Sequence, residues 1–240
     1  MDFNYLGYKN LLRLLVANHY RIVKYTDSEK ERCEAILRHD IDYDLKKSLD
    51  LARIESEQKV TSTYFVLLTT DFYNVFSKHN VKMIKEIAEM GHDIGLHFDE
   101  MNYPDIVGNS DAIINAILNE AHILESAFCI PIRSVSMHRP SKEILQANLQ
   151  IPGIINSYSD KFFRNYKYLS DSRRRWREPV EDIIKSQQYD KLHILTHAFW
   201  YNDEEIALRD TLEMFIEKAK QDRLKTLCDN FTNLDEVLGG

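Results

Sequence analysis

Two patterns of apolar residues follow one another along the chain. Short apolar runs are typical of buried strands, and longer stretches with an apolar residue every three or four positions are typical of helices. An amphipathic helix is expected over residues 3–20, where leucines recur at helical spacing. A buried strand is expected over residues 35–42, because an apolar run leads into it, and Asp44 is well placed to cap the helix that follows. Residues 62–68 are short and rich in β-branched and aromatic side chains, so they predict a second buried strand.

The same alternation continues to the end of the chain. Further strands are expected at 93–97, 134–138, 154–158, 167–170 and 192–197. Helices are expected around 81–88, 110–124 and 208–219, with a short one capped by Ser141. Strands that alternate with helices form a parallel sheet, and about seven such units without a glycine-rich phosphate loop favour an α/β barrel in a single domain. Since a full (β/α)8 barrel takes about 250 residues, a slightly short or distorted barrel fits this length.

Composition and charge narrow the classes of function. The chain has 240 residues, of which 44% are apolar, and a net charge of −7, which supports a packed core and argues against general nucleic-acid binding. Cys33, Cys129 and Cys228 cannot all pair and show no metal-type spacing, as is typical of free thiols in a reducing compartment. The first residues lack the features of a signal peptide, and no stretch has the roughly 20 apolar residues of a membrane span. We therefore expect a cytoplasmic protein without an integral membrane segment.

Two aspartates stand at the end of the first expected strand. In a strand, Asp40 and Asp42 point to the same side, whereas His39 and Ile41 point to the other. Two neighbouring carboxylates repel each other and are costly to bury without a cation or a shared proton. The alternative is a pair of capping residues in a solvated loop, but Asp44 is better placed to be the cap. We interpret the pair as one carboxylate on a metal ion and the other as a base.

Histidines occupy the ends of three further expected strands. They are His97, His138 (followed by Arg139) and His197. Because catalytic residues of barrels lie at the carboxyl ends of the strands, four strands would deliver histidine or aspartate to one rim. Histidine and carboxylate ligands with one open position are what a catalytic zinc ion or a similar metal requires.

At this point the sequence resembles the polysaccharide deacetylases, which are the family 4 carbohydrate esterases. Five segments between residues 35 and about 200 follow the order of that family's motifs: RHDID, GHDIGLHFD, SMHRPS, the segment from SDS to Trp176, and ILTHAFW. The resemblance implies a distorted (β/α)7 barrel over residues 35–240, with residues 1–34 as an N-terminal helical extension packed on it. It also implies a metal-dependent enzyme that removes N-acyl groups from amino sugars.

The resemblance also assigns roles to single residues. Asp40 matches the catalytic base, Asp42 the metal-binding aspartate, His97 the first metal-binding histidine and His197 the general acid. Asp171 and Trp176 match the segment that supports the base and forms a wall of the pocket. The implied cofactor is one divalent ion, zinc first, with nickel or cobalt as alternatives. Asp40 would then take the proton of the attacking water, and His197 would protonate the departing amine.

One family position departs from the pattern. The second histidine ligand lies four residues after the first, and Met101 occupies that place here. A thioether is a poor ligand for such an ion, so His138 is the expected substitute, with Asp99 and Glu100 as second choices. Arg139 is then expected to orient Asp40.

A basic, aromatic segment modifies the expected substrate. Seven lysines and arginines lie between residues 161 and 177, interleaved with aromatic residues. They could form a solvated loop that balances acidic neighbours, or they could bind a phosphate or carboxylate of the substrate. On the second interpretation the substrate-binding residues are Arg175, Trp176, Arg177 and Trp200. The substrate would be a nucleotide- or lipid-phosphate-linked amino sugar, a small-molecule or carrier-linked precursor of a surface polysaccharide.

Two other functions remain open from the sequence. The protein could be a deformylase or another linear-amide hydrolase on the same barrel. It could also be a catalytically inactive carbohydrate-binding relative, for which Met101 is the best support. The presence of Asp40, Asp42, His97 and His197 together argues against the inactive relative, because buried charges without a partner are costly.

Overall fold

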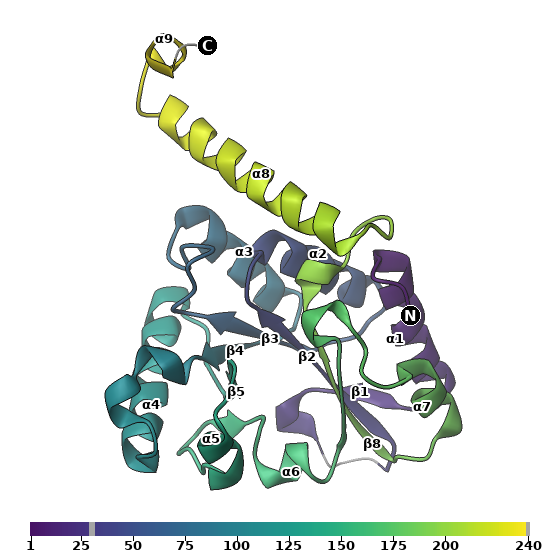
Figure 1. Ribbon diagram of the computed structural model, residues 1–240. Helices are drawn as coiled ribbons and strands as arrows, with labels where there is room; N and C mark the ends of the chain where they lie inside the picture. The colour runs from purple at the N-terminus through teal and green to yellow at the C-terminus, as the bar shows by residue number, and fades with distance from the viewer. Residues whose placement is uncertain (29–31, 239–240) are drawn as a thin grey trace.

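The structure, a computed structural model, describes residues 1–28 and 32–238 and is built around one parallel sheet (Figure 1). Its eight strands are β1 (Arg21–Val23), β2 (Glu34–Ile41), β3 (Thr63–Leu67), β4 (Asp93–Phe98), β5 (Ser134–Met137), β6 (Ile155–Asn156), β7 (Lys167–Ser170) and β8 (Lys191–Thr196). All of their pairings are parallel, in the order β6-β5-β4-β3-β2-β8-β7. Within the described residues no pairing joins β6 to β7, so the curled sheet stays open there. The expected distorted (β/α)7-type barrel in a single domain is confirmed.

The helices are α1 (Tyr5–Ala17), α2 (Leu45–Glu57), α3 (Lys78–Glu89), α4 (Ser110–Phe128), α5 (Lys142–Ala147), α6 (Asp160–Phe163), α7 (Val180–Ser186), α8 (Leu208–Cys228) and α9 (Leu234–Leu238). Helices α1 to α7 surround the sheet on its outer side, whereas most of α8 and α9 project away from it (Figure 1). The last long helix extends well beyond its expected end at residue 219, and α7 lacks the long apolar repeat that would have predicted it. No helix of the described chain combines the length and the apolar character that crossing a membrane requires.

The N-terminal region is joined to the barrel by packing and by a strand. The expected helix is present as α1, whose buried face includes Tyr8, Leu11 and Leu15. Each fully buried leucine contributes about 1.5–3 kcal/mol, so this face holds α1 on the barrel. The short strand β1 follows and pairs with the first half of β2, whereas β3 pairs with the second half. Three residues give too little alternation to predict such a strand from sequence. The boundary after residue 34 stays a prediction.

Strand β2 is the centre of the sheet, and all eight of its residues are buried. It ends just before Asp42, and α2 begins at Leu45 because the side chain of Asp44 accepts the backbone N–H groups of Lys46 (2.8 Å) and Lys47 (3.3 Å). The strand and the helix thus leave a short turn between them, and this turn carries Asp42 to the rim of the barrel.

The side of β2 that faces α2 is held by a buried carboxylate. Glu55 of α2 lies 3.0 Å from Nε2 of His39, and it accepts hydrogen bonds from the hydroxyls of Tyr8 (2.6 Å), Ser62 (2.7 Å) and Tyr64 (2.7 Å). A buried carboxylate is tolerated when its oxygens are fully hydrogen-bonded. This network connects α1, α2, β2 and β3, and it leaves the opposite face of β2 for Asp40.

A glycine allows two strands to pack below the rim. Gly95 in β4 lies opposite Phe65 in β3, and a Cβ atom at position 95 would lie 2.5 Å from the Phe65 ring. No side-chain carbon tolerates such a contact, so glycine is required here for close approach. Two residues further along β4 is His97, on the same side of the strand.

Candidate active site

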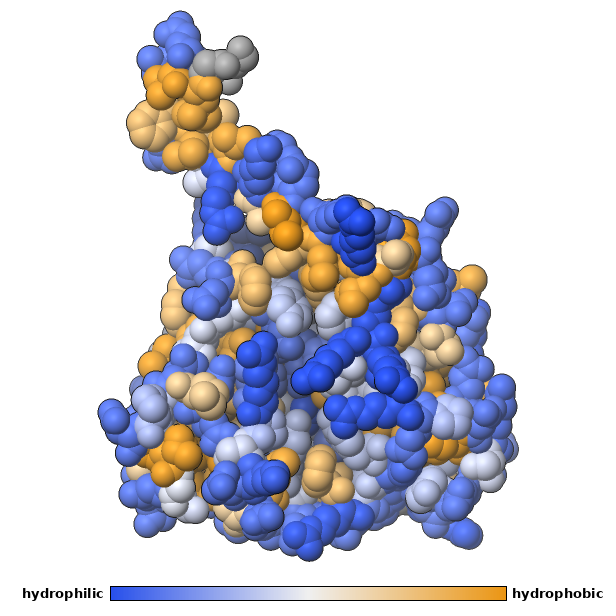
Figure 2. All heavy atoms as spheres, in the orientation of Figure 1, coloured by the Kyte–Doolittle hydropathy of each residue, from blue (hydrophilic) through white to orange (hydrophobic). Residues whose placement is uncertain are grey.

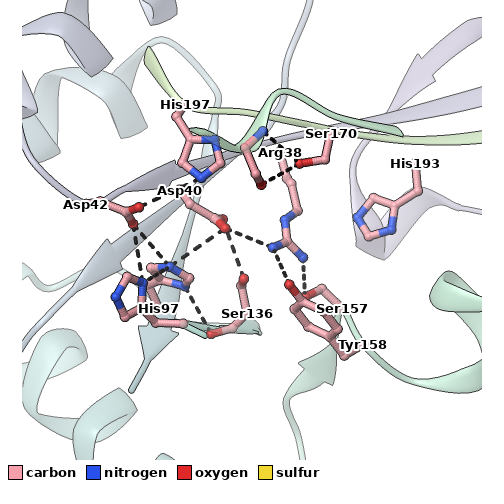
Figure 3. A network of polar contacts seen from close by, with 12 residues as sticks. Arg38, Asp40, Asp42, His97, Ser136, Ser157, Tyr158, Ser170, His193 and His197 are labelled. Carbon is pink, nitrogen blue, oxygen red and sulfur yellow. Dashed lines mark hydrogen bonds and ion pairs between the residues drawn. The ribbon is translucent and has the colours of Figure 1, made fainter. Parts of the chain in front are cut away.

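Ionisable side chains meet at the carboxyl ends of five strands. Asp40 belongs to β2 and Asp42 follows it directly, while His97 is the penultimate residue of β4. His138 directly follows β5, Asp171 follows β7, and His197 follows β8. Figure 3 shows Asp40, Asp42, His97 and His197 turned toward one another at this end of the sheet.

Three of these side chains form a triangle of possible metal ligands. Nε2 of His97 lies 3.3 Å from Oδ1 of Asp42 and 3.2 Å from Nδ1 of His138, and the third edge, from His138 to Asp42, is 3.6 Å. A tetrahedral zinc ion with bonds of about 2.0–2.1 Å places its ligand atoms about 3.3 Å apart. Oδ1 of Asp42 is buried without a hydrogen-bond partner. The donor set and its spacing therefore fit a divalent ion.

The outer nitrogens of the two histidines face oxygen atoms, so the inner nitrogens, which lie 3.2 Å apart, point into the triangle. Nδ1 of His97 donates to the backbone carbonyl of Ser136 at 3.2 Å, so Nε2 is the nitrogen that the neutral ring would offer to an ion beside Asp42. His138 directs Nδ1 inward, and its Nε2 lies 3.9 Å from Oδ2 of Asp99. Asp99, an alternative ligand by sequence, thus stands behind His138, on the side away from the triangle.

The remaining ligand candidates have other positions. Glu100 is buried and accepts hydrogen bonds from the backbone N–H and the hydroxyl of Ser141, which connects the loop after β4 to the loop that carries His138. Met101 lies at the surface with 69% of its side chain exposed. The structure therefore places His138, and neither Glu100 nor Met101, beside Asp42 and His97.

Asp40 is paired with an arginine of its own strand. Nη2 of Arg38 donates to Oδ2 of Asp40 at 2.8 Å, and Ser136 Oγ lies 3.4 Å from Oδ1. The guanidinium also donates to the hydroxyls of Ser157 (2.9 Å) and Tyr158 (3.2 Å). Burial by itself would raise the pKa of Asp40, but the charges of Arg38 and the nearby histidines outweigh it and hold that pKa below its usual range.

Arg139 was expected to orient Asp40, and this expectation was wrong. Arg139 is exposed, with a φ of 49°, and the guanidinium on Asp40 belongs to Arg38. Sequence reasoning missed Arg38, although a usable signal existed. Residues i and i+2 of a strand share a face, and a buried carboxylate on that face requires a cation.

His197 is held by Asp171. Its Nδ1 lies 2.7 Å from Oδ1 of Asp171, which also accepts the backbone N–H of His197 (3.0 Å) and, through Oδ2, the hydroxyl of Tyr201 (3.1 Å). Burial opposes the charged imidazole, but the hydrogen bond to Asp171 and the carboxylates of Asp42 and Asp40 raise the pKa of His197 to about 9. Nε2 of His197 faces Oδ2 of Asp42 at 3.8 Å. Asp171 was expected to support the base, Asp40. It contacts instead the imidazole of His197, the expected acid.

The basic segment after Asp171 lies at the rim. Arg175 and Arg177 are exposed, and Trp176 is half-buried. Trp200 is buried, with its ring centre 6.4 Å from that of His197. Arg174 has a different position, because it donates to the carbonyl of Ile206 and so fastens this segment to the chain before α8. In Figure 2, strongly hydrophilic side chains gather around a hollow in the middle of the face shown, over the loops at the ends of the strands.

Taken together, the site offers complementary acid–base chemistry. Asp40 is an anion that can accept a proton, and His197 is a cation that can donate one. The triangle of Asp42, His97 and His138 lies between them and can hold a cation. Amide hydrolysis requires such a combination of base, acid and electrophile.

Comparisons with known proteins give distant similarities to solved structures. No protein-family model and no curated protein matches the chain. Among solved structures, the chain is similar to a family 4 carbohydrate esterase (CE4) pseudoenzyme from Bacillus anthracis, with 14% identity and a TM-score of 0.44 over 80% of this chain and 62% of that one. It is also similar to the catalytic domain of a peptidoglycan N-acetylglucosamine deacetylase from Eubacterium rectale, with 15% identity and a TM-score of 0.45 over 78% and 84% of the two chains.

A third similar structure is a polysaccharide deacetylase from Bacillus cereus, with 16% identity and a TM-score of 0.45 over 78% of this chain and 89% of that one. The chain spans less than two thirds of the length of the Bacillus anthracis pseudoenzyme, 62%. At these identities and TM-scores the likeness carries no argument about this chain, and the function is inferred from the residues of the site.

Proposed function

We propose that this protein is a metal-dependent hydrolase that removes an N-acyl group, acetyl first, from an amino sugar. The observation that carries the proposal is the triangle of Asp42, His97 and His138, with edges of 3.2–3.6 Å, which lies between an ionised Asp40 and a protonated His197. The five motifs that resemble polysaccharide deacetylases support the same reaction. By this proposal the chain is a divergent member of that family.

Asp42, His97 and His138 would hold the ion. Two imidazoles and one carboxylate suit zinc, and nickel or cobalt can use the same donors. A bound divalent ion supplies Lewis-acid polarisation of the acyl carbonyl and of the attacking water. His97 is fixed for this task by the carbonyl of Ser136, and His138 is backed by Asp99.

Asp40 and His197 would carry the proton transfers. Asp40 takes a proton from the attacking water, and Arg38 keeps it ionised for that purpose. His197 donates the proton on Nε2 to the departing amine, while Asp171 keeps Nδ1 protonated and the ring oriented. Each such transfer contributes typically about 10²–10⁴-fold to the rate.

The substrate is proposed to carry phosphate. Arg175 and Arg177 are exposed cations of a protein whose net charge is −7, and within the described residues no ion pair neutralises them. Both follow Asp171 closely, and Trp176 and Trp200 offer flat apolar surfaces for a sugar ring. Arginine recognises phosphate through paired hydrogen bonds. We therefore favour a nucleotide- or lipid-phosphate-linked amino sugar, a cytoplasmic precursor of a surface polysaccharide.

Metal content tests the central part of the proposal. Protein purified without chelator or affinity tag should contain about one zinc, nickel or cobalt ion per chain by elemental analysis, the ratio expected for a single three-ligand site. His138→Ala should lose this metal, whereas His79→Ala, a change at an exposed position in α3, should retain it. Wild-type protein without metal, even after incubation with zinc, would contradict the hydrolase.

Substrate charge is tested separately. A nucleoside-diphosphate-linked N-acetyl amino sugar should be deacetylated with a kcat/KM at least about 10-fold above that of the free sugar, since each charge-assisted hydrogen bond contributes about 1.5–3 kcal/mol. Arg175→Ala/Arg177→Ala should remove most of this preference. Equal activity on both sugars would contradict phosphate recognition and leave the deacylase intact.

Two alternatives have different products. A linear-amide hydrolase such as a deformylase would act on formylated compounds and spare acetamido sugars. Identification of the product, formate or acetate, therefore separates this alternative from the proposed deacetylase. The position of Met101 favours an inactive carbohydrate-binding relative, because this residue is exposed where the family has a ligand. Sugar binding without release of acetate by the metal-loaded protein would support that alternative.

A further inference from the structure

Helix α8 leaves the barrel after a short contact. Its first half is fastened to the body, because the Phe215 ring packs 5.1 Å from that of Phe199, and Nζ of Lys218 lies 3.0 Å from Oδ2 of Asp44. Of the 21 residues of this helix, all of them described, one is buried, Thr211. Figure 1 shows the rest of α8 standing away from the sheet and its surrounding helices. A long helix with so little burial is stabilised either by a further partner or by ion pairs along its own surface.

The free side of α8 carries an apolar strip. Leu208, Leu212, Ile216 and Leu227 are 40–68% exposed. At 100° per residue they fall within an arc of about 100°. Leu208, Leu212 and Ile216 cover about 12 Å of the helix axis, and Leu227 lies about 29 Å from Leu208, with Ala219 and Arg223 on the same arc between them. Beyond the helix Phe231 is 52% exposed. Figure 2 shows apolar surface at the base of this helix and at its outer end, with hydrophilic side chains between the two. An apolar strip of this kind is typical of a helix that packs against another helix.

The charges of α8 are separated by sign along its length. Residues 208–217 contain three carboxylates and one cation, which gives a net charge of −2. Residues 218–228 contain four cations and one carboxylate, which gives +3. If two copies of α8 lie antiparallel, the acidic half of each faces the basic half of the other. In a parallel pair, halves of the same sign would repel. Charge of this pattern selects orientation between paired helices.

We propose that α8 is a dimerisation element that binds α8 of a second copy of this chain in antiparallel orientation. A two-fold axis across the middle of the helix pair makes the interface self-complementary, as closed dimers require. The apolar strip supplies the buried surface, and the opposite charges of the halves set the direction. This inference does not depend on the proposed hydrolase, since it uses no residue of the active site.

The competing explanation is internal to the helix. Acidic residues near the N-terminus and basic residues near the C-terminus also stabilise a single helix through its dipole. Arg209 and Glu213 form an ion pair of 2.7 Å within the helix. Exposed pairs of this kind are worth about 0.3–0.5 kcal/mol, so they can exchange partners at little cost. The single-helix explanation predicts a monomer, and charge reversal separates the two explanations.

Two variants of the full chain provide the test. Glu213→Lys/Glu217→Lys makes both halves of α8 positive, and Lys220→Glu/Arg223→Glu makes both negative, while Lys218 keeps its contact with Asp44. By sedimentation velocity we expect the wild type to be a dimer at micromolar concentration. Each variant alone should show at least a 10-fold weaker self-association, and an equimolar mixture of the two should recover the dimer. Circular dichroism of each variant verifies that the helix is retained.

An uncharged variant completes the design. Leu212→Ser/Ile216→Ser removes the middle of the strip and should abolish the dimer without changing the charge. A wild-type monomer at 100 µM would overturn the proposal. So would a dimer that survives both charge reversals, or variants whose mixture stays monomeric, because pairing of α8 with α8 demands complementary halves.

Discussion

Nη2 of Arg38 donates a hydrogen bond of 2.8 Å to Oδ2 of Asp40, on the same face of β2, and both side chains are buried. The guanidinium has further partners, because it also donates to the hydroxyls of Ser157 and Tyr158, which directly follow the edge strand β6. Two buried opposite charges are tolerated because each compensates the other. Removal of one partner leaves the other charge buried without compensation.

Arg38→Met should therefore destabilise the protein by about 3–5 kcal/mol, the usual cost of breaking a buried ion pair. Urea denaturation measures this change. Arg139→Met is the matched control, and it should stay within about 0.5 kcal/mol of the wild type because Arg139 is exposed. The double variant Arg38→Met/Asp40→Leu should recover part of the loss. If Arg38→Met were as stable as the wild type, Arg38 would not be the counter-ion of Asp40.

Asp99→Asn tests the support behind His138. Oδ2 of Asp99 lies 3.9 Å from Nε2 of His138, on the side of the ring that faces away from Asp42. Loss of a carboxylate behind a histidine ligand typically weakens metal binding about 10–100-fold. Competition with a chromogenic zinc chelator measures the affinity, and Asp105→Asn, at an exposed position of the same loop, is the control. Unchanged zinc affinity would show that Asp99 plays no part in the site.

Asp171→Asn tests the proton donor. Without the carboxylate, the pKa of His197 should fall from about 9 toward its ordinary value, because Asp171 is the leading cause of its elevation against the effect of burial. NMR titration of the ring in metal-free protein measures this pKa. The kcat should fall at least about 100-fold, as expected for loss of one oriented proton transfer. Tyr201→Phe removes one hydrogen bond to Asp171 and should have a smaller effect on both quantities. A pKa of His197 that stays near 9 in Asp171→Asn would contradict this role.

Glu120 gives a prediction for stability against pH. Burial raises its pKa from 4.5 to about 7, against the hydrogen bond that it accepts from the hydroxyl of Tyr103 at 2.6 Å. The folded state therefore binds a proton more tightly than the unfolded state. Its contribution to the free energy of unfolding is full below pH 4.5 and is lost as the pH rises to about 7. The loss is on the order of 3 kcal/mol, at about 1.36 kcal/mol per pKa unit.

Glu120→Gln should remove this loss. The variant should be more stable than the wild type at pH 8, and the difference should vanish near pH 4.5. Chemical denaturation at a series of pH values measures both, with Glu89→Gln, at an exposed position in α3, as the control. A constant difference between variant and wild type across this pH range would refute the assignment.

The sequence alone determined the barrel and the ends of its strands. Short apolar runs that alternate with amphipathic helices have local periodicities, and those periodicities depend on backbone geometry that is the same in every protein. Because polar residues at the end of a buried strand emerge at one rim, Asp40, Asp42, His97, His138 and His197 could be expected to meet there. That His138, and not Met101, lies beside His97 could be anticipated for the same reason, since β4 and β5 are neighbouring strands that end side by side.

The partners of these residues were decided by the tertiary structure. Asp171 meets His197 across 26 positions of sequence, and Arg38 reaches Ser157 across 119. Such pairings depend on the register between strands and on the direction of each loop, and local periodicity carries no information about either. The course of α8 belongs to the same class, because its helical pattern was visible but its departure from the barrel was not. A helix is specified by contacts four residues apart, whereas its docking depends on surfaces that only the folded chain brings together.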